Sequence, residues 1–125
     1  MRTLESSRLG QVHISVTDVD RAVEFYRDRL GLTFLFRVPG QPMAFFDCGG
    51  TRLYLAEPEP GFHSQPVLYF AVASIDEAYA ELQEADVPFQ DAPHRVHADD
   101  AHELWLAFFS DPDGCVLALM EERRV

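Results

Sequence analysis

The feature that most constrains this sequence is an internal repeat of a strand followed by a helix. Residues 11–32 read QVHISVTDVDRAVEFYRDRLGL, in which strand-like residues lead through a polar turn into an amphipathic helical pattern. Residues 67–87, VLYFAVASIDEAYAELQEADV, repeat that order at a shift of 56 positions. The shift places Val16 on Val72 and Asp18 on Ser74. The repeat predicts two copies of one folding module.

Both predicted helices carry start and stop signals. Asp18, or Thr17 one residue earlier, suits the N-cap of the first helix, and Gly31 suits its C-terminal end. The second helix opens on a capping box, Ser74-x-x-Glu77, and ends near Asp86, where an aspartate tolerates left-handed backbone better than most residues. The buried stripes are predicted to be Val19, Ala22, Val23, Tyr26 and Leu30 in the first helix, and Ile75, Ala78, Leu82 and Ala85 in the second.

Each helix is followed by strand patterns. In the first copy these are residues 33–38, 43–46 and 51–56, with a hairpin turn at 47–50. In the second copy Phe89 opens a short strand, residues 92–103 are predicted as loop or an irregular strand end, and strands at 104–109 and 115–120 flank the turn DPDG. The predicted organisation is one domain, 1–125, with modules at 9–56 and 67–122 and a Pro-rich connector at 57–66.

Composition limits the partners. The length of 125 residues suits one compact domain, and 47% hydrophobic residues suit a globular protein. The formal charge is −11 and all cationic side chains are arginine, which excludes nucleic acid and anionic membrane as partners. No apolar run approaches a membrane span, no targeting segment is evident, and the two cysteines form no metal motif, so a cytoplasmic location is expected.

The segments VTDVDRAVEFYRDRLGL, at 16–32, and FFSDPDGCVLALMEE, at 108–122, are similar to the two ends of the vicinal oxygen chelate superfamily. This superfamily includes glyoxalase I, the bleomycin-resistance proteins and the extradiol dioxygenases. The resemblance implies an α+β fold in which two tandem βαβββ modules form a cup-shaped mixed β-sheet with helices outside. It also implies a homodimer.

The metal enzymes of that superfamily bind a divalent ion through four strand positions, which typically hold His or Gln, Glu, His and Glu. The resemblance places these positions on Gln11, Tyr54, Val67 and Ala118. Only Gln11 is a familiar ligand there, and a zinc site needs three or four donors, so we predict no metal and no cofactor. A register slip of two residues is an alternative that puts His13 and Tyr69 at the first and third positions.

Several residues are candidates to contact a ligand. His13 shares a strand face with Gln11. It either acts on a ligand, as a base or a hydrogen-bond donor, or its hydrogen bonds are satisfied by a neighbouring side chain of the protein. Tyr54 and Tyr69 either stack on a ligand or fill the core, and Trp105 lies either in the core, at a dimer contact or in the ligand wall. The full predicted set is Gln11, His13, Phe45, Tyr54, Tyr69, His97, Glu103, Trp105 and Met120.

A second group of polar residues lies in the predicted loop at 92–103. His94, His97 and His102 are interspersed with acidic residues there, which fits either a surface metal site or an ordinary solvated loop. His97 and Glu103 are also candidates for the rim of the cup, because binding residues are often on loops.

These observations support three hypotheses of function. The first is a small-molecule-binding member of the superfamily that holds an organic ligand in the cup without a metal. The second is a metal-dependent lyase, isomerase or dioxygenase, which leaves open whether the protein is an enzyme. The third is a structural or regulatory dimer whose cup is filled by its own side chains. The negative charge favours a cationic ligand.

Overall fold

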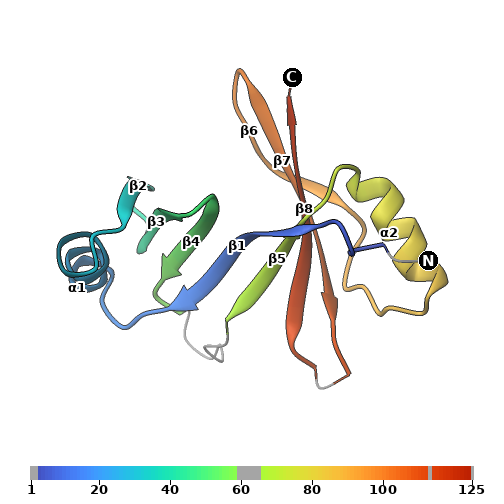
Figure 1. Ribbon diagram of the computed structural model, residues 1–125, viewed down its shortest axis with the longest axis horizontal. Coiled ribbons are helices and arrows are strands. Elements are labelled where there is room, and N and C mark those ends of the chain that lie inside the picture. Colours follow the sequence, from blue (N-terminus) through green and yellow to red (C-terminus); the bar gives the residue numbers. More distant parts are fainter. Residues whose placement is uncertain (1–2, 59–65, 113, 125) are drawn as a thin grey trace. The chain divides into compact units, whose positions relative to one another are not determined.

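The computed structural model describes residues 3–58, 66–112 and 114–124, and it divides into two compact units (Figure 1). The first unit is Gln11–Val67, and the second combines Met1–Gly10 with Leu68–Val125. Residues 59–65 of the predicted connector lie outside the described residues. Within the described ranges, no helix has the length and apolar character needed to cross a membrane.

The first unit is a mixed sheet with one helical segment. Its sheet has the order β2-β3-β4-β1, in which β2, β3 and β4 are antiparallel neighbours and β1 runs parallel to β4. The helix α1 continues directly into a π-helical turn, η1. The elements are β1 (Arg8–Ser15, of which residues 11–15 belong to this unit), α1 (Val19–Glu24), η1 (Phe25–Arg29), β2 (Thr33–Arg37), β3 (Met43–Cys48) and β4 (Thr51–Ala56).

The second unit repeats this topology. Its sheet has the order β6-β7-β8-β5, again with antiparallel neighbours except for the parallel pair β5 and β8. The elements are β5 (Val67–Ala71), α2 (Ile75–Glu84), β6 (His94–Ala98), β7 (His102–Ser110) and β8 (Val116–Arg124). The α+β class and the duplication of a βαβββ module are therefore confirmed.

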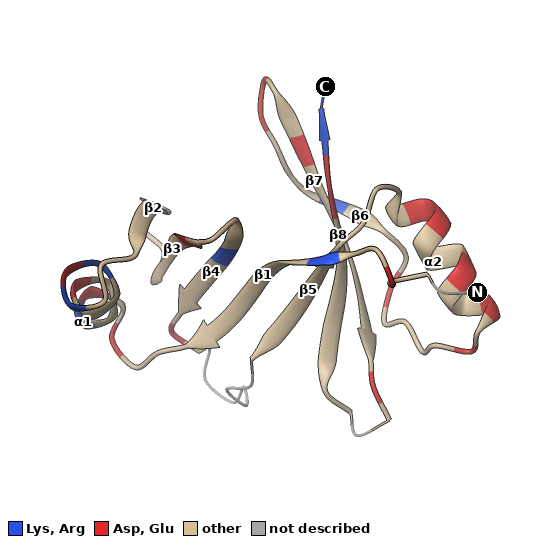
Figure 2. Cartoon of the chain, in the orientation of Figure 1, with Lys and Arg blue, Asp and Glu red and all other residues tan. Residues whose placement is uncertain are grey.

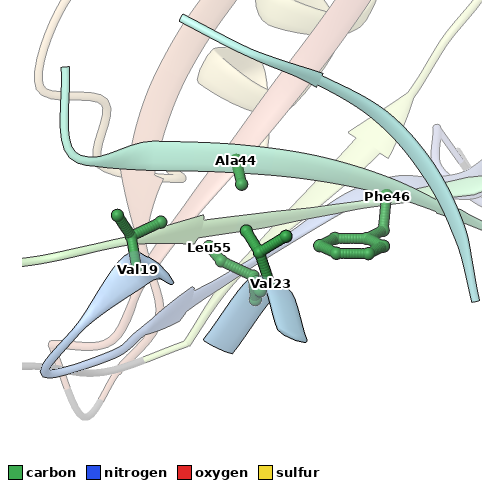
Figure 3. Packing of buried hydrophobic residues seen from close by; sticks show 5 residues of the cluster. All are labelled: Val19, Val23, Ala44, Phe46 and Leu55. Carbon is green, nitrogen blue, oxygen red and sulfur yellow. The ribbon is translucent and has the colours of Figure 1, made fainter. Parts of the chain in front are cut away.

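The core of the first unit lies between its helix and one face of its sheet. Val19 and Val23 of α1 point toward Ala44 and Phe46 of β3 and toward Leu55 of β4 (Figure 3). Phe46 and Leu55 are fully buried, and each such side chain contributes about 1.5–3 kcal/mol of hydrophobic stabilisation. Since side chains alternate along a strand, the intervening residues of β3 and β4 face the opposite side of the sheet.

The second core follows the same plan. Ile75 and Ala78 of α2 pack on Ala107 and Phe109 of β7 and on Leu119 of β8. As predicted, Ile75 and Ala78 therefore belong to the buried stripe of α2. In each unit the helix covers one face of the sheet. The side chains on the other face are therefore not needed for the helix–sheet core.

The predicted helix ends are confirmed. The Asp18 carboxylate accepts a hydrogen bond from the Arg21 N–H at 3.2 Å, and the Ser74 hydroxyl accepts one from the Glu77 N–H at 3.2 Å. Asp86 has a φ of 64°, the left-handed conformation expected after α2.

Four parts of the structure differ from the predictions. Ala85, predicted in the buried stripe of the second helix, is exposed at the C-cap of α2. Leu30, predicted to be buried, is 54% exposed, because the Leu30 N–H bonds to the Phe25 carbonyl five residues back and the wider π turn shifts the helical phase. Residues 94–98, predicted as loop or strand end, form β6 and pair with β7. Phe89 makes only an isolated bridge, to Phe109, so the strand expected there starts later.

Candidate functional site

Ring-bearing side chains from all strands of the first unit meet on the face away from α1. Adjacent members are cross-strand partners: Phe36 with Phe45, Phe45 with Tyr54, and Tyr54 with His13. The centroids of these successive pairs are 4.6, 4.8 and 4.8 Å apart. The first two pairs are stacked, at 22° and 10°, and the third is edge-on, at 63°. We call Phe36, Phe45, Tyr54 and His13 the aromatic row.

A bulge in β2 positions the outer end of this row. The register shifts between Phe34 and Phe36, so that Phe34 pairs with Phe46 while Phe36 pairs with Phe45. Phe34 thus packs on the core, whereas Phe36 stacks on the row. In an unbroken strand, two residues separated by one position face the same side. The bulge is therefore the reason that Phe36 joins the row.

A polar pair lies beside the aromatic row. The Arg52 Nε–H donates to the Gln11 Oε1 at 2.6 Å, and the two residues are cross-strand partners in β4 and β1. Gln11 is only 6% exposed, so its amide is held in a fixed environment. The Arg52 Cζ lies 5.7 Å from the centroid of the Phe45 ring, within the range of a cation–π contact. A positive charge therefore lies beside the aromatic row.

Burial also affects the central ring of the row. Desolvation raises the pKa of Tyr54 above its ordinary value of 10.0, because the phenolate would lose water contacts. The Tyr54 hydroxyl is consequently protonated at neutral pH and serves as a donor or acceptor of hydrogen bonds. The aromatic row is thus a mostly apolar surface that carries the protonated hydroxyl of Tyr54 and has one guanidinium at its side.

The superfamily's metal positions do not fit a divalent ion in this chain. The only amide oxygen in the set, the Gln11 Oε1, already accepts from the Arg52 guanidinium, whose positive charge repels a cation. Tyr54 supplies a protonated phenol, and Val67 and Ala118 have no donor atoms. Across the described residues no group of three or more His, Cys, Asp or Glu side chains could hold a metal.

The register-slip alternative supplies no more ligands. His13 makes an edge-on contact with Tyr54 in the first unit. In the second unit Tyr69 is buried, is the cross-strand partner of Ala118, and makes an edge-on contact with Phe108 at 6.3 Å. Of these residues only His13 is a common metal ligand, and a single imidazole does not complete a metal site.

Trp105 and Glu103 lie on the helix-covered face of the second unit. Trp105 packs against the core cluster of α2, β7 and β8, and its Nε1–H donates to the Glu103 Oε1 at 3.0 Å. The Arg123 guanidinium lies 4.3 Å from the Trp105 ring centroid, and Arg95 pairs with Glu103 at 3.2 Å. The pKa of Glu103 is lowered most by the hydrogen bond from the Trp105 N–H, and further by the charges of Arg95 and Arg123. Neither residue belongs to the aromatic row.

The remaining predicted residues also lie outside the row. Met120 is buried in β8. His97, in β6, is an exposed residue whose imidazole lies 3.6 Å from the Asp99 carboxylate. His94 instead contacts Asp91, at 3.2 Å. His94 and His97 therefore have separate acidic neighbours, and the His102 N–H donates to Asp99 at 2.7 Å. Of the predicted set, Gln11, His13, Phe45 and Tyr54 come together in the first unit.

Sequence reasoning missed Arg52 and Phe36. The signal for Arg52 was present, because a residue two positions before Tyr54 in a strand faces the same side. Phe36 had no such signal, since its direction depends on the bulge.

Comparisons with known proteins agree with this fold. The model of the Glyoxalase/Bleomycin resistance protein/Dioxygenase superfamily matches residues 8–119. The uncharacterized protein YraH of Bacillus subtilis (strain 168) is 30% identical over 120 residues, covering 85% of this chain and 91% of that protein. A superfamily member from Vibrio splendidus 12B01 has a TM-score of 0.73 at 18% identity, with 94% of this chain and 100% of that chain covered. Hypothetical protein BH1468 from Bacillus halodurans C-125 has a TM-score of 0.73 at 23% identity, with 95% and 96% covered. The chain therefore belongs to the Glyoxalase/Bleomycin resistance protein/Dioxygenase superfamily.

Proposed function

We propose that this protein binds a small organic molecule that carries an aromatic ring, on the aromatic row and without a metal ion. The observation that supports this most is the near-parallel stack of Phe45 on Tyr54, at 4.8 Å and 10°, on a sheet face that no helix of the first unit covers. Aromatic rings provide large apolar contact areas, and stacked or edge-on pairs add about 0.5–1.5 kcal/mol beyond burial.

Polar groups beside the rings supply orientation. The protonated hydroxyl of Tyr54 offers a hydrogen bond beside His13, which ends the row, and Gln11 holds Arg52 beside the row. A mostly apolar surface with a few placed polar groups is the usual composition of a small-molecule site. This arrangement supports binding, and it requires no Lewis acid.

Ligand-induced stabilisation tests this proposal. The probe is 2-naphthamide, an uncharged bicyclic aromatic, and the readouts are the unfolding temperature and calorimetric titration. We expect a rise in unfolding temperature with probe concentration, because a ligand that binds only the folded state stabilises it by mass action.

The matched variants are Tyr54→Leu and Tyr79→Leu. Tyr54→Leu removes the central ring of the row and should weaken binding about tenfold, on the scale of a lost aromatic contact. Tyr79, on α2, stacks edge-on with Phe89 in the second unit, so Tyr79→Leu should leave the affinity unchanged. Equal affinities of wild type and Tyr54→Leu, or no binding to the wild type, would contradict the proposal.

A dimer that covers the row with its own residues is the second candidate function. Leu35 and Phe36, on the edge strand β2, are 44% and 45% exposed, and an exposed apolar edge strand favours pairing with another chain. Sedimentation of wild type and Phe36→Ser tests this candidate. A stable dimer that Phe36→Ser dissociates, together with no probe binding, would favour this function over ligand binding.

A further inference from the structure

We infer that a hollow beside α1 and η1 is a further binding site, which takes an elongated aromatic molecule with an anionic group, such as a carboxylate, at each end. Arg21 and Arg29 bind the two anionic groups, and Phe25 contacts the ring between them. This site is distinct from the one under the proposed function, because the aromatic row lies on the sheet face away from α1.

The size of the hollow suits a small molecule. It lies within the first unit and has a volume of about 470 Å³, and small-molecule sites usually have about 300–1,000 Å³. Its lining comes from the connection after β1 and from α1 and η1, and it includes Arg21, Phe25, Tyr26 and Arg29. A compound with two fused rings therefore fits the available space.

An accessible aromatic ring forms the apolar part of the hollow. Phe25 is 44% exposed, and its ring contacts Tyr26 edge-on, at a centroid distance of 5.6 Å and an angle of 78°. Tyr26 packs on the core of the first unit and contacts the buried Phe46 at 5.8 Å. Tyr26 therefore supports Phe25 from the protein side, and the exposed part of Phe25 is available to a ligand.

The π turn brings the two arginines and the phenylalanine onto one side of the helical segment. Phe25 lies four positions from both Arg21 and Arg29, and residues four apart are neighbours on a helix surface. In an α-helix of 3.6 residues per turn, however, residues eight apart point about 80° away from each other. The π turn, in which the Leu30 N–H bonds to the Phe25 carbonyl at 3.0 Å, has more residues per turn and so reduces this angle.

The guanidinium groups of the hollow carry charge that is available to an anion. Within the described residues, neither the Arg21 nor the Arg29 side chain forms an ion pair or a hydrogen bond. Arg27 of the same segment, in contrast, bonds to the Asp28 carboxylate at 2.8 and 3.0 Å. Arginine presents a planar fork of N–H donors that matches a carboxylate. Arg21 and Arg29 can therefore each bind one anionic group.

The distribution of charge favours the same ligand. Figure 2 shows basic as well as acidic residues on α1 and η1, whereas α2 carries acidic residues and no Lys or Arg. The total charge of −11 favours a cationic ligand, but exposed charges separated by more than about 8 Å are largely screened at physiological ionic strength. The charges that line the hollow therefore matter more than the total charge.

Two carboxylates also line the hollow, and each has another role. The Asp18 carboxylate caps α1 by accepting a hydrogen bond from the Arg21 N–H at 3.2 Å. Glu24 acts on Arg27, whose pKa is raised most by the hydrogen bond to Asp28 and further by the charges of Asp28 and Glu24. In the part of the chain that the structure describes, neither carboxylate pairs with a guanidinium of the hollow.

The spacing of the two arginines determines the shape of the ligand. Arg21 and Arg29 are eight residues apart, about 12 Å along a helix axis with a rise of 1.5 Å per residue. This separation suits anionic groups at opposite ends of a ring system rather than two adjacent groups. Phe25 lies midway between the arginines in the sequence, so ring contact and both ion pairs act on one molecule.

Two isomers of one dianion test the inference. The probes are naphthalene-2,6-dicarboxylate, with carboxylates at opposite ends, naphthalene-2,3-dicarboxylate, with adjacent carboxylates, and the uncharged 2-naphthamide. Each is titrated into the full-length protein in about 100 mM salt, at which the Debye length is about 10 Å. NMR shifts of the backbone amides of residues 19–29 and of the Nε–H groups of Arg21 and Arg29 report binding at the hollow and not at the aromatic row.

We expect the 2,6-isomer to bind the hollow about threefold more tightly than the 2,3-isomer, the scale of one additional exposed ion pair. It should bind about tenfold more tightly than 2-naphthamide, because two ion pairs are then absent. Higher salt should weaken the binding of both dicarboxylates, since exposed ion pairs are screened.

Variants at exposed positions assign the preference to individual side chains. Arg21→Gln and Arg29→Gln should each remove the preference for the 2,6-isomer, because one guanidinium remains. Phe25→Ala should weaken the binding of all three probes. Arg27→Gln is the matched control, since it removes the same charge from the same segment but Arg27 pairs with Asp28 outside the hollow. It should keep the preference.

Three outcomes overturn the inference. The first is equal affinity of the wild type for the two dicarboxylates, or a preference for the 2,6-isomer that survives in both Arg21→Gln and Arg29→Gln. The second is the absence of shifts in residues 19–29 with every probe. The third is self-association that Phe25→Ala abolishes, which assigns the hollow to a second copy of the chain. None of them affects the proposed function, which Tyr54→Leu tests at the aromatic row.

Discussion

Glu57 and Glu121 show at the residue scale how the duplicated module is held together. The Glu57 Oε2 accepts a hydrogen bond from the Val19 N–H at 3.0 Å, and the Glu121 Oε1 accepts one from the Ile75 N–H at 2.8 Å. Glu57 directly follows β4 and Glu121 lies within β8, the strands parallel to the first strand of each module, and each carboxylate binds the first residue of the helix. Since the first N–H groups of a helix have no partner within it, both helices gain an acceptor and a favourable charge.

We predict that Glu57→Ala destabilises the protein by about 1 kcal/mol, the usual cost of a lost helix cap. Urea unfolding measures this change, and Glu57→Gln should lose less, because the amide retains an acceptor oxygen. Glu24→Ala is the control, since Glu24 ends α1 and is exposed. Equal stability of the wild type and Glu57→Ala would contradict the capping role.

Tyr54 gives a prediction on pH. Burial raises its pKa above 10.0 in the folded state, while the unfolded chain keeps the ordinary value. The folded state therefore binds the Tyr54 proton more tightly than the unfolded chain does. The contribution of this group to the free energy of unfolding is fully present below pH 10 and is lost as the pH rises through the folded pKa. The measurement is an absorbance titration of wild type and Tyr54→Phe at alkaline pH. The difference between the two curves should show one tyrosine that ionises at a higher pH than its ordinary pKa of 10.0. A Tyr54 that ionises at the ordinary pKa of 10.0 would contradict its burial.

At the scale of elements, small irregularities decide which side chains are available. The π turn after α1 moves Leu30 to the surface, and the bulge in β2 turns Phe36 onto the aromatic row. Asp86 ends α2 in the left-handed conformation that glycine adopts most easily. Each irregularity changes the direction of a chain segment without changing the type of element around it.

Asp86→Gly should stabilise the protein by about 0.5–1 kcal/mol. The left-handed conformation costs a non-glycine residue about 1–2 kcal/mol, and the greater freedom of glycine in the unfolded chain removes part of this gain. Thermal unfolding measures the change. Ala85→Gly is the matched control one residue earlier, where φ is −88°, and it should destabilise by about 1 kcal/mol. A loss of stability in Asp86→Gly would show that the aspartate makes a compensating contact.

At the scale of the whole molecule, the two modules share a topology but differ in the side chains on their sheets. Tyr54 of the first module corresponds to Ala118 of the second, 64 positions later, as Gly50 corresponds to Gly114. The first module carries the aromatic row, whereas Ala118 is buried beside Tyr69 and Phe108. The common fold therefore does not determine the chemistry of either module.

We predict that the purified protein binds no stoichiometric divalent ion through these positions. Calorimetric titration with Zn²⁺ and elemental analysis of protein prepared without chelator are the measurements, and EDTA should leave the unfolding temperature unchanged. The reason is the donor set, in which the Gln11 oxygen is already bonded to Arg52. One equivalent of bound metal that is lost in Gln11→Ala would contradict this account.

Much of the fold follows from local pattern. Apolar periodicity identified both helices, the polar caps at Asp18 and Ser74 located their starts, and strand alternation placed Gln11 and His13 on one face. The existence of two βαβββ modules followed from the repeat itself. These properties depend on residues that are near one another in the chain, so one sequence suffices to predict them.

The composition of the aromatic row depended on the tertiary structure. Trp105 was expected in the core, at a dimer contact or in a ligand wall, and its place in the second core came from the register of β7 against β8. Phe36 reaches the row through a bulge, and Arg52 is fixed by Gln11, a residue 41 positions earlier. The sequence by itself determined the two modules and the two faces of the first strand, because these follow from backbone periodicity. Only tertiary structure decided which side chains meet, because strand register and bulges depend on pairing between distant segments.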